Sequence, residues 1–198
     1  MRVFPSQSTK VTLIAKLNLF CVLFFMTIAS PLANSAPKKN PDQSFDNVSR
    51  ENYNGDGLNR EGSITHNFSL RRSSLIETDF KEAVLTDFDF NDVDLSRADF
   101  RGCRVSNSSI HNCKFAKARL EGARIVDSDF TANSFRDAKL DSTIFIRTNL
   151  HGCDFRGAHL HDALFILSNL SGALFNKSTQ LPFSSETALK RGMIFESN

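Results

Sequence analysis

Hydrophobic residues recur in this chain at a strict interval of five. From Leu70 to Phe175 every fifth residue is apolar, with no insertion and no slip. The residue two positions before each of them is nearly always Ala, Ser, Thr or Cys. An α-helix requires apolar residues about every 3.6 positions, and a half-buried strand requires them about every 2, so this period fits neither. An internal repeat of this regularity predicts a solenoid.

The period predicts a chain that turns a corner every five residues. Each short face would point one large side chain inward beside a small one. Four faces would close a coil, so that residue n stacks on residue n+20 at the strand spacing of roughly 4.8 Å. One predicted inward column is Phe80, Phe100, Leu120, Leu140 and Leu160. Glycines share the phase two residues after the large side chain, where a turn with positive φ is expected: Gly102, Gly122, Gly152, Gly157 and Gly172.

The repeat resembles that of the pentapeptide-repeat family, whose motif is A-(D/N)-L-x-x. Residues 98–102 (ADFRG) match it throughout, and 153–157 (CDFRG) and 168–172 (SNLSG) are close variants. The resemblance covers residues 68–176 and implies an all-β fold, a right-handed quadrilateral parallel β-helix of about five coils. Phe88 and Asn133 depart from it by placing a bulky or polar group where a small one belongs, which bears on the local corner geometry.

The chain divides into four predicted regions. Residues 1–35 read as a secretory signal with basic Arg2, Lys10 and Lys16, an apolar stretch over 17–29, and cleavage after Ser35. A periplasmic or secreted location follows, and the alternative is an uncleaved segment that anchors the chain in the inner membrane. Residues 36–66 are polar and turn-rich, which predicts a flexible linker before the β-helix of 67–176.

Residues 177–198 are expected to cap the C-terminal end of the solenoid. Ser185 is predicted to N-cap a short helix over 186–191, with Gly192 as its C′ residue. Such a cap would cover the last apolar rung and the open strand edge. Residues 60–70 are expected to do the same at the other end.

The charge balance argues against a nucleic-acid partner. Lys and Arg number 24 against 22 Asp and Glu, and three of the basic residues lie in the predicted signal. Acidic residues dominate from Glu77 to Asp99. Some pentapeptide proteins associated with quinolone resistance resemble B-DNA and bind gyrase, so the resemblance leaves binding to a topoisomerase as an alternative. That role requires a strongly acidic rod in the cytoplasm, which a nearly neutral chain with an export signal does not match.

No residues form a catalytic or cofactor-binding pattern. Cys103, Cys113 and Cys153 hold the small inner position, and Cys113 and Cys153 would lie two coils or roughly 9.6 Å apart. A disulfide requires Cα atoms within about 7 Å, so the three are expected to be buried thiols. His159 and His161, with Asp141 one coil below, are the weak candidates for a metal site, and a solvated surface explains them better. We therefore predict a protein without enzymatic activity, metal or cofactor.

The strongest candidate for a functional site is an apolar outer surface. Outward positions should be polar, yet six residues of one predicted face are hydrophobic: Val126, Ile144, Ile146, Leu164, Ile166 and Leu167. Such patches commonly mark interfaces. The alternatives are an unknown protein partner, a homodimer, or coverage of the patch by residues 183–195. Contact with a membrane is expected only if the N-terminal segment is not cleaved. The sequence thus predicts an exported repeat scaffold that binds protein through one face.

Overall fold

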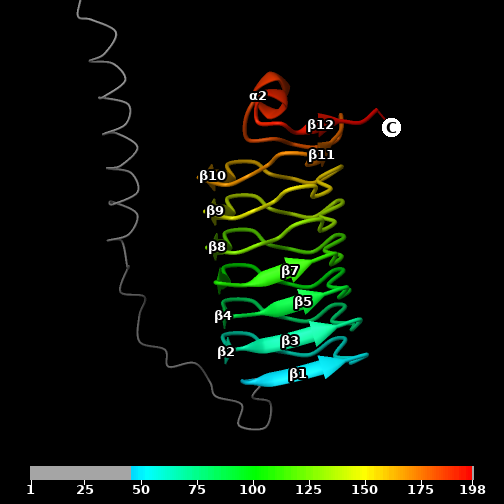
Figure 1. Ribbon diagram of the computed structural model, residues 1–198, viewed down its shortest axis with the longest axis vertical. Coiled ribbons are helices and arrows are strands. Elements are labelled where there is room, and N and C mark those ends of the chain that lie inside the picture. The colour runs from blue at the N-terminus through cyan, green and yellow to red at the C-terminus, as the bar shows by residue number, and fades with distance from the viewer. Residues whose placement is uncertain (1–45, 198) are drawn as a thin grey trace, which may run out of the picture. The chain divides into compact units, whose positions relative to one another are not determined.

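The computed structural model describes residues 46–197, which form a parallel β-solenoid of about seven turns. The predicted signal peptide of 1–35 and residues 36–45 of the predicted linker lie outside the described residues. Short strands stack coil upon coil in Figure 1. The elements in chain order are β1 (Val48–Glu51), β2 (Ile64–His66), β3 (Phe68–Arg71), β4 (Val84–Thr86), β5 (Asp89–Asn91), β6 (Arg104–Ser106), β7 (Ser109–His111), β8 (Arg124–Val126), β9 (Ile144–Ile146), β10 (Leu164–Ile166), β11 (Leu174–Phe175), α2 (Ser185–Lys190) and β12 (Ile194–Phe195).

The strands form parallel sheets on the faces of the solenoid. A six-stranded sheet, here called the long sheet, has the order β10-β9-β8-β6-β4-β2, and a four-stranded sheet has the order β1-β3-β5-β7. Leu85 pairs with Val105, and Val105 pairs with Ile125. The stacking of residue n on n+20 is therefore confirmed. Isolated parallel bridges such as Asp79 to Asp99 continue the same register on the remaining faces.

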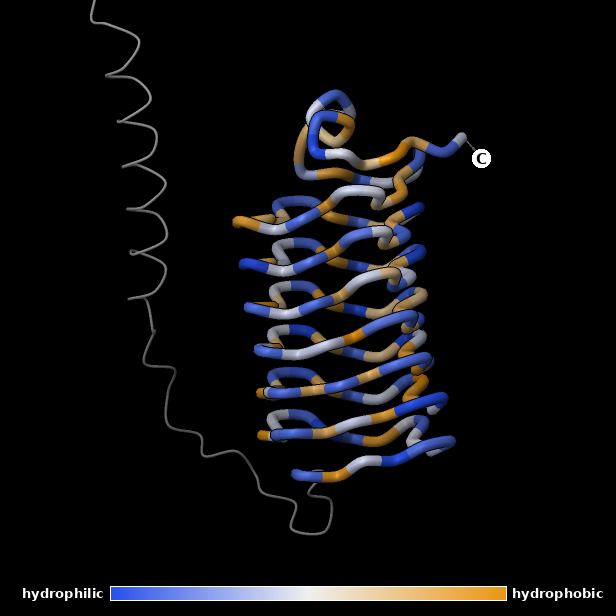
Figure 2. Tube along the Cα trace, viewed as in Figure 1, coloured by the Kyte–Doolittle hydropathy of each residue, from blue (hydrophilic) through white to orange (hydrophobic). Residues whose placement is uncertain are grey.

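The large periodic side chains fill the interior. Figure 2 shows hydrophobic and polar residues alternating along every coil. Phe115, Phe135 and Phe155 stack in one column, with ring centroids 4.8 and 5.3 Å apart. The small position beside each large one is also buried, as at Ala98 and Ala138. Close stacking of rings and methyl groups removes this apolar surface from water, which is the main stabilising contribution.

Left-handed backbone marks the corners. Gly102 and Gly122 have φ of 64° and 69°, as the phase of the glycines predicts. Aspartates just before the large residue stabilise these turns, because Asp79 and Asp99 accept the backbone N–H bonds of Lys81 and Arg101.

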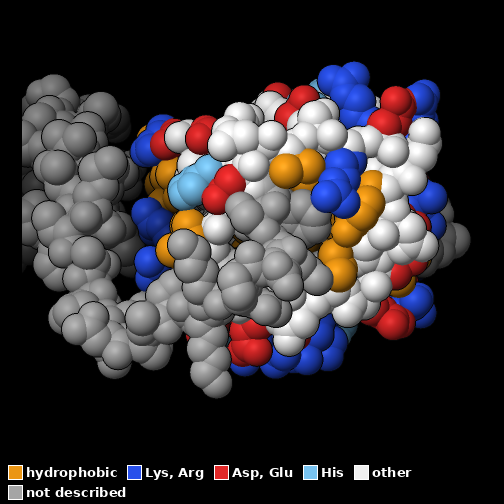
Figure 3. Space-filling view, turned by 90° about the horizontal axis from the view of Figure 1, so that it is seen from below, with side chains coloured by type: hydrophobic (Ala, Val, Ile, Leu, Met, Phe, Trp, Pro, Cys, Tyr) orange, Lys and Arg blue, Asp and Glu red, His pale blue; other side chains and the backbone are white. Residues whose placement is uncertain are grey.

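Residues 46–66 of the linker predicted over 36–66 instead belong to the first coil of the solenoid. Strand β1 of this coil pairs with β3 of the next coil, and β2 pairs with β4. Residues 60–70 accordingly belong to the coils and do not form a separate cap. Extension of the repeat toward the N-terminus explains why the solenoid has about seven turns where about five are expected. Figure 3, seen from below, shows hydrophobic side chains among charged ones at this end.

The C-terminal segment ends the solenoid with a helix and one more strand. Helix α2 begins one residue earlier than expected, because Ser184 and not Ser185 is the N-cap and accepts the N–H bond of Thr187 at 3.2 Å. Gly192 follows the helix with a φ of 80°, as predicted for the C′ residue. Strand β12 then pairs with β11. Within residues 46–197, no helix is long and apolar enough to cross a membrane.

Candidate interaction surface

The six residues of the predicted apolar surface lie together on the outer side of the long sheet. Ile144 pairs with Leu164, and Ile146 lies between Val126 and Ile166. Leu167 directly follows β10 in the chain. We call this group of six residues the apolar patch.

Members of the apolar patch differ in their exposure. Leu164 is 42% exposed and Leu167 is 74% exposed, whereas Ile146 is only 7% exposed. Val126, Ile144 and Ile166 are half-buried. The side chains available to a partner are therefore chiefly Leu164 and Leu167, at the C-terminal end of the sheet.

Leu167 combines exposure with an unfavourable backbone conformation. Its φ is 53°, in the left-handed region that bulky residues rarely occupy. The equivalent corner positions carry Asn67, Asp87, Asn107 and Asp127, residue types that tolerate this conformation, and then Arg147 with a φ of 48°. Neither burial nor turn chemistry explains a leucine here.

The C-terminal segment packs beside the apolar patch and leaves its outer end exposed. Phe183 contacts Phe165 edge-on at a centroid distance of 6.1 Å, and Met193 is buried beneath the helix. Strand β12 continues the column of β11, on another face. One alternative from the sequence is that residues 183–195 cover the patch. The structure shows Leu164 and Leu167 exposed, so this segment does not cover them.

Two arginines beside the apolar patch escaped the sequence analysis. Arg104 and Arg124 hold the outward position of β6 and β8, directly below Ile144 and Leu164 in the same column. Comparing residues twenty positions apart would have found them, because from β2 to β10 the column reads Ile, Val, Arg, Arg, Ile, Leu. The candidate surface therefore contains charge as well as hydrophobic area.

The weak candidates for a metal site do not converge. Asp141 Oδ1 accepts the backbone N–H bond of His161 at 3.1 Å, and the His161 ring lies 3.0 Å from Asp162. His159 belongs to a bridge with Lys139 below it. In the part of the chain that the structure describes, no three His, Cys, Asp or Glu side chains could hold a metal ion together.

The described cysteines are buried thiols. Cys103, Cys113 and Cys153 form no disulfide. Burial raises the pKa of the Cys113 and Cys153 thiols to about 12, and that of Cys103 is raised as well. Because the thiolate is the reactive form, these side chains are inert.

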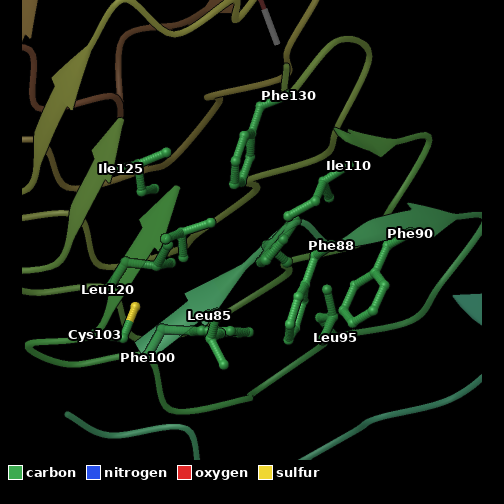
Figure 4. A pocket seen from close by; sticks show the side chains of 12 residues that line it. Leu85, Phe88, Phe90, Leu95, Phe100, Cys103, Ile110, Leu120, Ile125 and Phe130 are labelled. Carbon is green, nitrogen blue, oxygen red and sulfur yellow. The ribbon is translucent and has the colours of Figure 1, made fainter. Parts of the chain in front are cut away.

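The interior leaves little room for a ligand. Figure 4 shows the side chains around its void, where Phe88, Phe100 and Leu120 point toward one another. The void has a volume of about 10 Å³, and a single water molecule needs about that much. The solenoid core is thus filled by its own side chains.

A charged network joins the last coils to the C-terminal segment. Asp154 lies between Arg136 and Arg156, and Arg156 also contacts Glu196 beyond β12. Burial opposes the charge of Asp154, but hydrogen bonds from Arg156 and Arg136 outweigh it and lower the carboxyl pKa to about 2. The network connects the segment after β12 to the solenoid.

Comparison with known proteins identifies the repeat. The family model described as "Pentapeptide repeats" matches residues 94–131 and 134–172 with 8 copies. The chain belongs to the pentapeptide-repeat family. The solenoid continues on both sides of the matched residues, from β1 to β11. Proteins of this family are generally structural or scaffold solenoids.

Solved structures of pentapeptide-repeat proteins are similar at low identity. A protein called Rfr23 from the cyanobacterium Cyanothece 51142 is 15% identical with a TM-score of 0.36, over 65% of this chain and 90% of that one. A protein from Nostoc Pcc 7120 is 24% identical with a TM-score of 0.30, over 60% and 84% of the two chains. QnrB1, a plasmid-mediated fluoroquinolone resistance protein, is 15% identical with a TM-score of 0.32, over 78% and 84%. The comparison with curated proteins finds no match.

Proposed function

We propose that this pentapeptide-repeat protein is a non-enzymatic, exported scaffold that binds another protein through the apolar patch. The observation that carries the proposal is the exposure of Leu164 and Leu167 at the end of the long sheet. Leu167 keeps its hydrophobic side chain in solvent in spite of a left-handed backbone. A contact with a partner would bury both leucines.

The rest of the described chain supports binding over catalysis. The interior is filled, and the buried thiols are held in their unreactive form. Ligand-binding pockets of enzymes are usually clefts of about 300–1,000 Å³ lined by apolar groups with a few convergent polar ones. A groove on the described surface is instead shallow, and it is lined by polar residues that include Asn107, Asp127 and Asn149.

The export part of the proposal comes from residues 1–35, whose basic, apolar and small residues follow the order of a secretory signal. Fusion of residues 1–45 to a reporter active only outside the cytoplasm tests it. Reporter activity supports export, and activity confined to the cytoplasm contradicts it.

A photo-crosslinking residue at position 167 tests the binding surface. We expect a discrete crosslinked species in cells that make the protein, and its loss when Leu164→Asp is added. Lys117, an exposed corner residue of another face, is the matched control position, where no such species should form. A species of twice the chain's mass would identify the partner as a second copy, and absence of any crosslink at 167 would overturn the proposed function.

A further inference from the structure

One column of the long sheet begins with Ile64 and Val84, continues with two arginines, and ends with two members of the apolar patch. Strand pairing places Arg104 next to Arg124, Arg124 next to Ile144, and Ile144 next to Leu164. Neighbouring coils are roughly 4.8 Å apart, so the part of the column from Arg104 to Leu164, here called the strip, extends over roughly 14 Å. Half of this strip is basic and half is apolar.

Other arginines of the solenoid have carboxylate partners. Arg97 pairs with Glu77, Arg119 with Glu121, and Arg147 with Asp127. Arg147 is the nearest of these to the patch, and its guanidinium already donates two hydrogen bonds to Asp127. Arg104 and Arg124 form no ion pair with any carboxylate among residues 46–197.

Stacking two such arginines is unfavourable in the free protein. Like charges directly opposite each other on neighbouring strands destabilise a sheet. An anionic group lying over both guanidinium groups would reverse the sign of this interaction, because guanidinium binds carboxylate bidentately. The arrangement favours a negatively charged occupant next to a hydrophobic one.

We propose that the partner contacts this strip with a short segment whose apolar side chains cover Leu164 and Leu167 and whose carboxylates reach Arg124 and Arg104. The inference rests on the proposed function and specifies the chemistry of the partner. Charge complementarity selects an acidic protein segment: its carboxylates neutralise the arginines, and its side chains bury the exposed leucines. An extended chain advances about 3.3 Å per residue, so four or five residues span the strip.

Selection from a random peptide library tests this proposal without knowledge of the partner. The purified chain is immobilised, and displayed 12-residue peptides are selected on it and sequenced. We expect enriched peptides to combine Asp or Glu with Leu, Ile, Val or Phe. On an Arg104→Glu/Arg124→Glu variant, the enrichment should change from acidic to basic residues. A Lys117→Glu/Lys139→Glu variant has the same charge change on other faces and should select the original peptides.

The outcomes separate this inference from the proposed function. One outcome is enrichment of apolar peptides with no excess of acidic residues, and loss of this enrichment on a Leu164→Asp/Leu167→Asp variant. That result would overturn the inference of an acidic segment but would support the apolar patch as a binding surface. If that variant enriches the same peptides as the wild-type chain, or if no peptide is enriched at all, both the acidic segment and the proposed function are overturned. Binding to phosphatidylglycerol vesicles that depends on Arg104 and Arg124, with no acidic enrichment, would assign the arginines to a lipid surface and overturn the proposal.

One selected acidic peptide then gives a quantitative test by fluorescence anisotropy. The Arg104→Glu/Arg124→Glu variant should weaken its binding at least tenfold, and added salt should weaken binding to the wild-type chain because the contact is ionic and exposed. Equal affinities for the two proteins would overturn the role of the arginines.

Discussion

Single residues show how the solenoid tolerates polar groups inside. Asn133 is 1% exposed, and it occupies a position where a small residue is expected. Its Nδ2 donates to the carbonyls of Ile110 and Phe130 at 2.7 and 2.8 Å, and its Oδ1 accepts the N–H bond of Cys113 at 2.8 Å. The amide thereby replaces corner hydrogen bonds, which explains why this departure from the repeat leaves the coil intact.

Asp154 should make stability depend on pH in the acid range. Its folded-state pKa of about 2 lies below the value of about 3.9 for an unfolded chain. The carboxylate therefore stabilises the fold above about pH 4, and this contribution is lost as the pH falls toward 2. We expect Asp154→Asn to lower the free energy of unfolding at pH 7 by about 1–2 kcal/mol, measured by urea denaturation.

Comparison across pH makes the test specific. The difference between wild type and Asp154→Asn should shrink between pH 4 and 2, because the wild-type carboxyl becomes neutral there. Asp79→Asn is the matched control, since Asp79 accepts the same kind of backbone bond from Lys81 without an ion pair in the described chain. A difference that stays constant across this pH range would contradict the assigned role of Asp154.

At the scale of elements, the first coil shows why part of the fold was missed. Its large side chains occupy the position that is small elsewhere, as at Val48, Tyr53 and Leu58, which pack against the core. The usual large position instead holds Gly55, and Arg60 is buried there. The five-residue period continues, but it is shifted by two residues, so a search at one phase finds only polar residues and glycine and predicts a linker.

The candidate surface was predictable only in its position. The period aligns Ile144 with Leu164 and Ile146 with Ile166, and it identifies the six apolar residues, because outward positions follow directly from the register. Exposure depends on how neighbouring side chains lie over one another, so the burial of Ile146 and the prominence of Leu167 required the structure. The importance of Arg104 and Arg124 likewise depends on which carboxylates lie within reach of them.

Helix α2 gives a test of its observed boundary. Ser184→Ala removes the side-chain oxygen that accepts the Thr187 N–H bond, and loss of an N-cap costs about 1 kcal/mol. We expect faster amide hydrogen exchange across 185–192, by about fivefold. Ser185→Ala should leave exchange nearly unchanged, because Ser185 is already inside the helix. A larger effect at Ser185 would restore the boundary expected from the sequence.

At the scale of the whole described solenoid, each coil contacts only its neighbours, so stability depends on unbroken inward columns. Phe135 lies near the middle, is fully buried, and stacks on Phe115 and Phe155. An aspartate there would meet aromatic rings above and below and no cation to pair with. Burying an unpaired carboxylate destabilises a fold by more than one apolar contact can offset.

Phe135→Asp should therefore abolish cooperative unfolding of the central coils, measured by circular dichroism during heating. Phe135→Leu should keep a cooperative transition, since Leu75 and Leu95 hold the same column in earlier coils and the substitution remains hydrophobic. Lys117→Ala, on the exposed corner, should change the free energy of unfolding by less than about 0.5 kcal/mol. A soluble Phe135→Asp variant that melts cooperatively would mean that Phe135 does not face the interior, and the register of every column would then have to be revised, because all of them share one period.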